Sequence, residues 1–470
     1  MPIPVITLAQ MRAWERATWA GGQTEAEVIR RVGKRIARRA RKLTKAGDTI
    51  LILAGKGHNG DDARAAKAHL DGRKVKFLEL LLPGSDLLKV EMALREKPAL
   101  IIDGMFGIGL NRPLAEAWQK IIAAVNATSI PVLAVDIPSG LNAETGEHFG
   151  AAIKATVTLT VGAPKTGLLM PAASTFVGRL ELADDIGLIA CSAKSELNWT
   201  LPEDFEQFPP TRPAAGHKGT FGHATLIAGS LGFHGAGVLT AHGAQRAQPG
   251  LVTLFTQPEV FVPVAAQLAA AMVNVWSPEI ELPKNASAFL IGPGLAAKKD
   301  SETLKHFTRQ LWRETPVPLV VDASALDFLT SDSFPANAIR VLTPHPGEAA
   351  RLLETTTEKV QANRVQSLRD LSKKFGGCWV ILKGNQTLVG RAEGDIFVNL
   401  SGNPHLAQGG SGDLLAGYLT GLLAQSNLQT EVLKTLRYAV WQHGATADQL
   451  QADRKNWIIE DLAREIGNTV

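Results

Sequence analysis

The residues with the clearest potential for chemistry lie near the C-terminal end of the chain. Gly402-Asn403-Pro404 precedes Gly409-Gly410-Ser411-Gly412-Asp413, and an apolar, helix-like run follows at Leu414–Leu423. Glycines before a helix let the backbone approach an anion, whose charge the free amides and the helix dipole stabilise. A carboxylate there would repel a phosphate, but it suits a base that takes a proton from a hydroxyl attacking a phosphoryl group. Asp413 is therefore a candidate base, and the alternative is a glycine-rich turn with Asp413 as a helix cap.

Four further strings in the second half of the chain could contribute to such a site. They are Gly216–His223, the glycine turn Ile291–Leu295, the string Thr343-Pro344-His345-Pro346-Gly347-Glu348, and Val380–Thr387, which contains Lys383-Gly384. A Lys-Gly pair at the end of a buried strand fits a nucleotide contact. Each string is weak by itself, since a lone histidine such as His345 is more often structural than catalytic.

In the first half, Asp136 ends an apolar run and is followed by the polar loop Ile137-Pro138-Ser139-Gly140. Ligands of parallel αβ sheets bind at such strand ends. The alternative interpretation is a Pro-Ser-Gly turn after a strand.

These groups need elements that bring them together, and the first half predicts a parallel sheet. Apolar runs alternate there with helix-like segments such as residues 63–71 and 114–127, which indicates helices on both faces of the sheet. Ligands bind at the carboxyl ends of such strands. The expected strands are Thr49–Ala54, Lys74–Leu80, Ala99–Asp103, Pro131–Asp136 and Ala155–Val161, and polar or glycine-rich loops follow at Gly55–Asp62, Asp103–Leu110, Asp136–Gly140 and Gly162–Gly167.

A second αβ series begins after the proline-rich link Phe208–Pro213, which is the best candidate for a domain boundary. We therefore expect an α/β protein of two domains, 1–207 and 212–470. The strands expected in the second domain are Ala224–Ala228, Leu251–Thr256, Ala288–Ile291, Leu319–Asp322, Arg340–Thr343 and Cys378–Lys383.

Composition narrows the class of protein further. The net charge of +4 over 470 residues is too small to indicate a nucleic-acid partner. Nine basic residues fall within residues 30–45, which favours an amphipathic helix with a solvated basic face over a patch for polyanions or a membrane. Cys191 and Cys378 lack metal-ligand spacing, and we expect neither a signal peptide nor a membrane span. A cytoplasmic enzyme without a membrane partner is the expectation.

Taken together and in order, the C-terminal motifs resemble those of the ADP/ATP-dependent NAD(P)H-hydrate dehydratases, which belong to the ribokinase-like superfamily. The resemblance extends from about Arg212 to the C-terminus and implies a ribokinase-like αβα domain. It also implies that a nicotinamide ring hydrated at C6 loses water at the expense of ADP or ATP, with Mg²⁺ bridging the phosphates. Phosphorylation would turn the C6 hydroxyl into a good leaving group.

The same resemblance assigns roles to residues of the second half. Asp413 would be the base and would also contact the hydrated dinucleotide. The other substrate contacts would be Ala236, Gly294 and His345. The nucleotide would be bound by Lys383, Gly384, Asn385, Gln386, Thr387 and Asn403, with Gly409, Gly410, Ser411 and Gly412 forming the anion hole.

The first half resembles the YjeF N-terminal domain, the NAD(P)H-hydrate epimerase, which implies a Rossmann-like three-layer αβα sandwich. The motifs that carry the resemblance are Ala54–Asp62, Asp103–Leu110 and Val135–Asn142. Asp136 would be the acid/base that interconverts the R and S hydrates at C6. The resemblance implies further substrate contacts at His58, Asn59, Asp62, Gly107, Ile108, Gly109 and Pro113, and a K⁺ ion held by Asn59, Asp103 and Ser139.

The chain departs from the family pattern in both halves. His405, Gln408 and Gln248-Pro249 replace smaller residues of the dehydratase pattern. In the N-terminal loop, His58 replaces an Asn, and Asp61 and Ala63 replace glycines. If residue 61 needs a positive φ, Asp61 is strained there, and its carboxylate would repel a pyrophosphate by about 1 kcal/mol or more. We therefore expect a weakened epimerase.

The resemblance thus predicts a bifunctional repair enzyme for hydrated NAD(P)H, acting on S hydrate in the C-terminal half, and it implies a homo-oligomer. The alternative is a small-molecule kinase of the ribokinase superfamily with a non-catalytic N-terminal binding module. Product analysis separates the two, because a kinase would release a stable phosphorylated metabolite.

Overall fold

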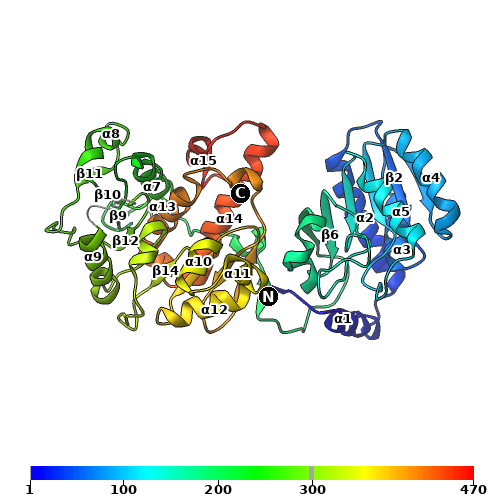
Figure 1. Ribbon diagram of the computed structural model, residues 1–470, viewed down its shortest axis with the longest axis horizontal. Helices are drawn as coiled ribbons and strands as arrows, with labels where there is room; N and C mark the ends of the chain where they lie inside the picture. The colour runs from blue at the N-terminus through cyan, green and yellow to red at the C-terminus, as the bar shows by residue number, and fades with distance from the viewer. Residues whose placement is uncertain (1, 296–300, 470) are drawn as a thin grey trace. The chain divides into compact units, whose positions relative to one another are not determined.

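The computed structural model describes residues 2–295 and 301–469, and the chain divides into two compact units (Figure 1). One unit comprises residues 3–195, and the other begins at Glu196. Both are α/β units built on a sheet whose central strands are buried. This agrees with the predicted fold class of two αβα domains.

The first unit contains a six-stranded parallel sheet in the order β3-β2-β4-β5-β6-β7. Its strands are β2 Thr49–Ala54, β3 Lys74–Glu79, β4 Leu100–Gly104, β5 Val132–Val135, β6 Val157–Val161 and β7 Arg179–Ala183. Its helices are α1 Leu8–Ala20, α2 Glu25–Leu43, α3 His58–Lys67, α4 Pro83–Arg95, α5 Glu116–Asn126 and the short α6 Ser174–Val177, and a two-residue strand, β1 Ile3–Pro4, precedes them.

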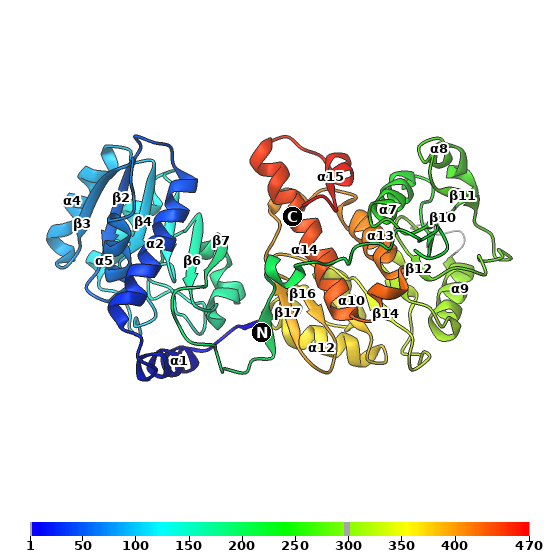
Figure 2. The same cartoon turned by 180° about the vertical axis from the view of Figure 1, so that it is seen from behind.

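The alternation of side chains along β2 shows how both faces of this sheet are covered. Ile50 and Ile52 pack with α2 and α3, whereas Leu51 and Leu53 pack with α4 and α5 on the opposite face. The two helix layers are visible on either side of the sheet in Figures 1 and 2. Gly33 lets α2 approach α3 closely, since a Cβ at this position would lie 2.6 Å from the Cβ of Ala65.

The second unit contains a larger sheet in the order β8-β17-β16-β15-β14-β13-β12-β9-β10-β11. Its strands are β8 Leu197–Trp199, β9 His223–Ile227, β10 Leu251–Thr256, β11 Met272–Val275, β12 Ala288–Ile291, β13 Leu319–Val321, β14 Arg340–Leu342, β15 Trp379–Leu382, β16 Thr387–Gly390 and β17 Ile396–Asn399. Its helices are α7 His234–Arg246, α8 Phe261–Ala265, α9 Ser301–Glu314, α10 Pro346–Leu352, α11 Thr357–Ala362, α12 Arg364–Lys374, α13 Ser411–Leu423, α14 Val432–Asp453 and α15 Ile459–Glu465.

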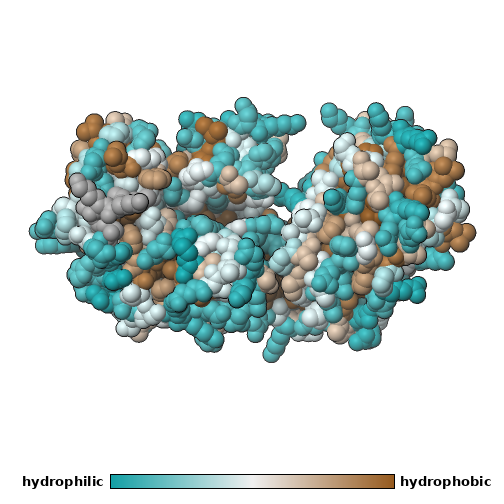
Figure 3. Space-filling view, viewed as in Figure 1, coloured by the Kyte–Doolittle hydropathy of each residue, from teal (hydrophilic) through white to brown (hydrophobic). Residues whose placement is uncertain are grey.

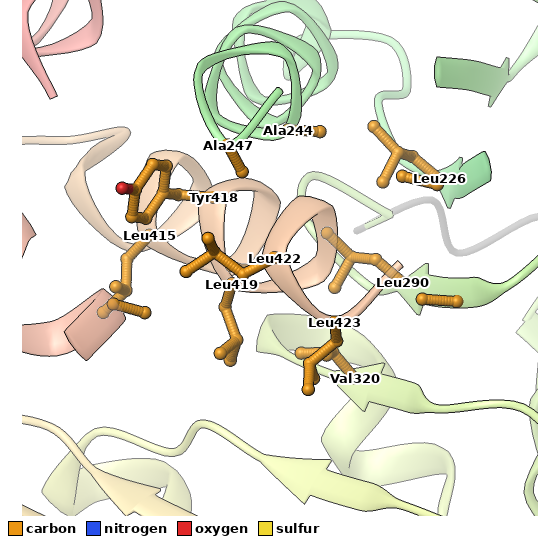
Figure 4. Packing of buried hydrophobic residues seen from close by; sticks show 14 of the residues in the cluster. Leu226, Ala244, Ala247, Leu290, Val320, Leu415, Tyr418, Leu419, Leu422 and Leu423 are labelled. Carbon is orange, nitrogen blue, oxygen red and sulfur yellow. The ribbon is translucent and has the colours of Figure 1, made fainter. Parts of the chain in front are cut away.

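The helix α13 is the centre of this unit. Figure 4 shows its Leu419 and Leu423 directed at strand residues such as Val320, while Ala244 of α7 lies on its other side. A Cβ on Gly417 would lie 2.0 Å from the carbonyl oxygen of Thr240 in α7, so only glycine permits this approach. The helices α7, α13 and α14 share one core with the sheet, which fixes where α13 begins.

Two features of the second sheet differ from the sequence interpretation. First, β15, β16 and β17 form antiparallel pairs within the otherwise parallel αβ series. The four-residue strands β16 and β17 are too short to stand out between glycine-containing turns. Second, β8 pairs in parallel with β17 and so belongs to the second unit, although residues up to 207 were expected in the first domain.

The basic helix predicted near residues 30–45 is α2, and much of its charge is neutralised locally. Arg39 pairs with Glu181 and Arg35 with Asp184, both of which lie in or after β7. Exposed apolar side chains occur elsewhere, at Leu88 and Met92 of α4, where Figure 3 shows hydrophobic atoms reaching the surface. Among the residues described, no helix has both the length and the apolar character needed to cross a membrane.

Candidate active sites

The carboxyl ends of the parallel strands of the second sheet converge on the start of α13. Asp322 directly follows β13, Thr343 follows β14 and Lys383 follows β15. A Cβ on Gly412, in the first turn of α13, would lie 3.3 Å from Lys383 Nζ. The structure therefore places the glycine turn and the Lys-Gly string in one site, as the motifs predicted.

The glycine turn has the backbone that the sequence suggested. Gly410 has a φ of 92°, a left-handed conformation that favours glycine. The first amides of a helix such as α13 lack acceptors within the helix and are available to a ligand. Ser411 is held from below by His443, whose Nε2 lies 3.1 Å from the Ser411 carbonyl oxygen. Burial lowers the pKa of His443 to about 4, so it contributes no charge at neutral pH.

Asp413 lies in the first turn of α13, beside the glycine turn. Burial, with the charge of Asp322 as the next cause, raises the pKa of Asp413 to about 6, and Lys383 opposes this shift. A carboxylate with this pKa is ionised at neutral pH but is a stronger base than an ordinary aspartate. The alternative role as a helix cap finds no support, because the N-cap residue is Gly410 and no side-chain hydrogen bond caps α13.

Lys383 is held by a buried carboxylate that the sequence interpretation did not include. Its Nζ donates to Asp322 Oδ1 over 2.8 Å, and Thr343 Oγ1 donates to the same oxygen over 2.7 Å. Burial lowers the pKa of Lys383, but the charges of Asp322 and Glu348 outweigh it, and the net shift is upward. Lys383 is therefore a permanent cation at the floor of the site.

The segment after Lys383, which was expected to bind nucleotide, is fixed by Arg364 of α12. Arg364 Nη2 donates to the carbonyl oxygens of Leu382, Lys383 and Gln386 over 3.0–3.3 Å. Gly384 has a φ of 126° and Gln386 a φ of 60°, so the chain turns sharply here. The predicted residues Asn385 and Thr387 follow this turn, and Asn385 is exposed where a ligand could reach it.

Asn403 is also positioned by a carboxylate, from α14. Asn403 Nδ2 donates to Asp448 Oδ1 over 3.2 Å, and the Gly402 amide donates to Asp448 Oδ2 over 3.0 Å. His405, one of the departures from the family pattern, is exposed and packs edge-on against Trp457.

Two of the three further residues expected to contact the hydrated dinucleotide lie side by side. A Cβ on Gly294 would be 2.7 Å from the Cβ of Ala236 in α7, and Ser230 fixes this contact by donating to the Gly294 carbonyl oxygen over 2.6 Å. His345 instead serves as the N-cap of α10, because its Nδ1 accepts from the Gly347 amide over 3.0 Å. Its side chain is 53% exposed, so it has a structural role and remains accessible.

In the first unit, Asp136 lies at the end of β5 with a φ of 61°, a left-handed conformation that is rare outside glycine. Its Oδ1 accepts from the Val161 amide over 2.9 Å and from Lys165 Nζ over 2.5 Å. Lys165 is completely buried, and its Nζ also donates to the Val161 carbonyl oxygen over 2.7 Å. A strained backbone with a buried ion pair is typical of a functional site rather than of an ordinary turn.

Two more carboxyl groups face this ion pair. Burial, followed by the charge of Asp136, raises the pKa of Asp62 well above its ordinary value. Burial also raises the pKa of Glu15 in α1, where Lys165 and Asp136 are the nearest charges. The site therefore combines a fixed base with acids that hold a proton more readily than usual.

The three residues expected to hold K⁺ surround the backbone of Phe106. Asn59 Nδ2 donates to the Phe106 carbonyl oxygen over 2.8 Å, and the Phe106 amide donates to Ser139 Oγ over 2.9 Å. Ser139 Oγ in turn donates to Asp103 Oδ1 over 2.6 Å. Asp103 is fully buried, and burial raises its pKa to about 6.

The loop that departs most from the family pattern begins a helix. Asp61 lies within α3, where its amide donates to the Gly57 carbonyl oxygen, and its backbone is not left-handed. The expectation of backbone strain at Asp61 is therefore wrong. The position that requires glycine is Gly60, where a Cβ would lie 2.1 Å from the Gly55 carbonyl oxygen. Asp61 is also neutralised in part, since Arg64 Nη1 lies 2.5 Å from its Oδ1.

The other predicted substrate contacts of the first unit lie around this loop. Gly107 is beside Asn59, because a Cβ on Gly107 would be 3.1 Å from the Asn59 Cβ. His58 is exposed and pairs with Glu25 over 2.9 Å. Ile108 is half-buried against the cluster of Ile6, Met11 and Ala163, whereas Gly109 and Pro113 are exposed.

Comparisons with known proteins found a matching family model for each of the two units. A family model described as NAD(P)H-hydrate dehydratase matches residues 224–470, and one described as YjeF-related protein N-terminus matches residues 83–167. The bifunctional NAD(P)H-hydrate repair enzyme of Gloeobacter violaceus is 34% identical, over 95% of this chain and 94% of its own length. The chain belongs to the bifunctional NAD(P)H-hydrate repair enzymes.

Other members of this repair family are similarly distant. The enzyme of Coxiella burnetii is 33% identical over 94% of this chain and 93% of its own length. Among solved structures, a ribokinase-like superfamily protein from Enterococcus faecalis is 25% identical, with a TM-score of 0.51 over 59% of this chain and 96% of that one. The second unit of this family member is thus ribokinase-like, as the motifs predicted.

Three residues that the motifs of the repair family did not single out become candidates in the structure. Asp322 and Lys165 are buried and Arg364 is half-buried, and each contacts a predicted site residue or the segment that carries it. Asp322 and Lys165 each follow an apolar strand, or lie a few residues after one, and this is the only signal in the sequence that could have drawn attention to them. Arg364 lies in a surface helix and carries no such signal.

Proposed function

We propose that this chain repairs hydrated NAD(P)H, with each compact unit carrying one of two activities. The second unit dehydrates the S hydrate in a reaction driven by ADP or ATP, and the first interconverts the R and S hydrates. The observation that carries the proposal is the position of Asp413, a carboxylate with a raised pKa in the first turn of α13, beside the glycine turn and Lys383.

The dehydration is proposed to proceed through a phosphorylated hydrate. Asp413 takes the proton of the C6 hydroxyl while the hydroxyl oxygen attacks the terminal phosphoryl group of the nucleotide. The nucleotide leaves with one phosphate fewer. The C6–O bond then breaks with its electron pair leaving on the phosphate, a proton is lost from C5, and the C5–C6 double bond returns. The products are NAD(P)H, orthophosphate and the nucleotide with one phosphate fewer.

The chain's own residues supply position and charge for these steps. The amides from Gly409 to Gly412 would hold the transferred group, and Lys383 would neutralise it. The Lys383–Thr387 segment and Asn403 would bind the nucleotide, and Ala236, Gly294 and His345 would contact the hydrate.

The second unit fits a magnesium ion that is bound mainly by the phosphates. Within the described residues, no group of three or more His, Cys, Asp or Glu side chains could hold a metal ion. Mg²⁺ commonly keeps several waters and takes its remaining ligands from substrate phosphates. When bound, it would neutralise phosphate charge during transfer.

In the first unit, epimerisation needs one proton donor and one acceptor near C6. Asp136 is the proposed acid/base, and Lys165 holds its Oδ1. Asp62, whose pKa is raised by burial and by the charge of Asp136, is the proposed proton donor. His58, Asn59 and the segment from Gly107 to Pro113 would bind the dinucleotide. Asp61 adds negative charge beside this site even when it is paired with Arg64, so we still expect a weakened epimerase.

A K⁺ ion fits the cluster of Asn59, Asp103 and Ser139. All three provide oxygen atoms, and a fully buried carboxylate such as Asp103 gains from a nearby cation. The ion would fix the loop that carries the phosphate contacts. The substrates are small metabolites, and the sequence expectation of a cytoplasmic homo-oligomer is part of this proposal.

The deciding experiment supplies the purified protein with a fresh mixture of R and S NADH hydrates, Mg²⁺, K⁺ and either ADP or ATP. Return of the reduced-nicotinamide absorbance, with one orthophosphate per NADH, is expected. A fast phase that consumes only the S form would show an active dehydratase with a disabled first unit. No nucleotide-dependent return, or a stable phosphorylated product, would overturn the proposal in favour of a kinase.

A further inference from the structure

The Asp322 carboxylate is the most deeply buried charge near the second active site. Its side chain is 1% exposed, at the end of the central strand β13. Its Oδ1 accepts from Lys383 Nζ over 2.8 Å and from Thr343 Oγ1 over 2.7 Å. Three neighbouring strands, β13, β14 and β15, thus contribute one residue each to a single hydrogen-bonded group at their carboxyl ends.

This group lies directly beneath the glycine turn. A Cβ on Gly412 would be 3.3 Å from Lys383 Nζ and 4.0 Å from Asp322 Oδ2. The glycine amides and the Lys383 ammonium therefore face the same small volume. An ammonium has three donor hydrogens, and the bond to Asp322 uses one of them.

The environment of Lys383 would make an unpaired ammonium costly. The lysine side chain is 19% exposed, and a buried lysine without a partner tends to lose its proton. Asp322 prevents this, since its charge offsets the effect of burial on the pKa of Lys383. Asp322 therefore keeps the lysine both charged and directed at the anion-binding turn.

We propose that Asp322 is a positioning residue, which holds the Lys383 ammonium beneath Gly409–Gly412 so that its charge meets the phosphoryl group during transfer. The inference rests on the proposed dehydratase function. It explains how Lys383, expected from the sequence to line the nucleotide, is held where it can neutralise the transferred group. The pair also sets the charge that the base Asp413 experiences.

The charged groups that act on Asp413 come from three elements. Asp322 follows β13, Lys383 follows β15 and Glu348 lies in α10. His443 of α14, which contacts Ser411, is neutral because its pKa is about 4. Asp322 and Glu348 raise the pKa of Asp413, whereas Lys383 lowers it. Removing Asp322 should therefore lower the pKa of Asp413, and removing Lys383 should raise it.

This opposition gives a test that a purely structural role would not pass. The variants are Asp322→Asn, Lys383→Met and the double variant. Each is assayed with S hydrate at saturating ATP from about pH 5 to about pH 9, a range that includes the pKa of Asp413. Each single variant is expected to lower kcat by about 10²-fold or more, as for loss of an oxyanion-stabilising group. The acidic limb of the kcat profile should move to lower pH in Asp322→Asn and to higher pH in Lys383→Met, by about one unit each.

The double variant separates positioning from stability. Removing one partner of a buried ion pair destabilises a protein, and removing both relieves much of that loss. We expect the melting temperature of the double variant to exceed that of either single variant, while its kcat stays as low as that of Lys383→Met. Recovery of kcat together with stability would overturn the inference, because the pair would then serve only the fold.

Two further measurements complete the test. Asp327→Asn, in the segment after Asp322, removes an exposed carboxylate that pairs with Arg351, and it should leave kcat unchanged. Nucleotide affinity, measured by calorimetry, should change less than about 5-fold in Lys383→Met, because a transition-state contact lowers kcat rather than binding. A loss confined to the nucleotide KM, or acidic limbs that do not move apart, would overturn the inference. Failure of the unaltered protein to consume S hydrate would instead overturn the proposed function.

Discussion

Asp136 and Lys165 form a buried ion pair in which Lys165 Nζ lies 2.5 Å from Asp136 Oδ1. The Val161 amide and Thr160 Oγ1 donate to the same oxygen, over 2.9 and 3.2 Å. Because these donors converge on Oδ1, the carboxylate is fixed through one oxygen, and Oδ2 is the oxygen suited to proton exchange with a ligand. The pair therefore fixes the orientation of the proposed base.

Replacement of either member of this pair should abolish epimerisation. Asp136→Asn keeps a side chain that tolerates a positive φ but removes the base, and Lys165→Met leaves the carboxylate without its fixed partner. We expect the rate of conversion of R hydrate to fall by about 10²-fold or more in both, while S hydrate is still dehydrated. Lys154→Met, which alters an exposed lysine before the start of β6, is the control. Unchanged R-hydrate consumption in Asp136→Asn would favour a non-catalytic binding module.

The raised pKa of Asp413 predicts the pH dependence of the dehydratase. A base must be ionised to act, so activity is present above the pKa and is lost as the pH falls through about 6. The kcat for S hydrate should therefore halve near pH 6, well above the pKa of an ordinary aspartate. Asp413→Asn should lower kcat by about 10²- to 10⁴-fold and leave nucleotide binding intact. Asp370→Asn, on the surface of α12, serves as the matched control. A kcat that stays constant down to about pH 5 would contradict the role of Asp413 as the base.

Arg364 should control nucleotide binding without touching the nucleotide. Its guanidinium joins three carbonyl oxygens of the turn at Lys383–Gln386, a geometry that lysine cannot reproduce. Arg364→Lys is expected to raise the KM for ADP or ATP by about 10-fold, because the turn that binds the nucleotide loosens. Arg369→Lys is the control, since Arg369 lies in the same helix and donates to the separate loop at Ala392. Equal effects of the two variants would indicate general destabilisation of α12.

Asp61 is expected to limit the epimerase through charge rather than through backbone strain. Asp61→Gly removes a carboxylate beside the pyrophosphate site and releases Arg64, so kcat/KM for R hydrate should rise several-fold. The gain should shrink at high salt, since screening weakens the repulsion. Glu79→Gln, which removes the other carboxylate paired with Arg64, provides the comparison. A fall in kcat/KM for Asp61→Gly would show that the Asp61–Arg64 pair supports the helix instead.

The fold and the sites were predictable from sequence to different degrees. Strand ends were located to within a residue or two because short apolar runs end in Gly, Asp or Lys, as at Asp322 and Lys383. Asp61 was misjudged because a loop motif does not show where a helix begins. The ion pair between Asp322 and Lys383 was missed because these residues are distant in sequence and meet only through the order of the strands, as do Asp136 and Lys165.

Potassium should stabilise the first unit specifically. A ligand that binds only the folded state adds about 2.7 kcal/mol at 100 times its Kd, which corresponds to several degrees in melting temperature. Replacing NaCl by KCl at equal ionic strength is therefore expected to raise the melting temperature of the protein, and Asp103→Asn should lose that difference. Identical melting curves in the two salts would remove the ion from the proposal.

The pairing of β8 with β17 has a consequence for how this gene could have been assembled. Leu197–Trp199 complete the sheet of the second unit, and Arg437 of α14 reaches back to Asp204 and lies over the rings of Phe205 and Phe397. A recombination event at the proline-rich stretch would remove a strand and part of the core from the second unit. A separation that preserves both units must therefore fall before Glu196 rather than at the prolines.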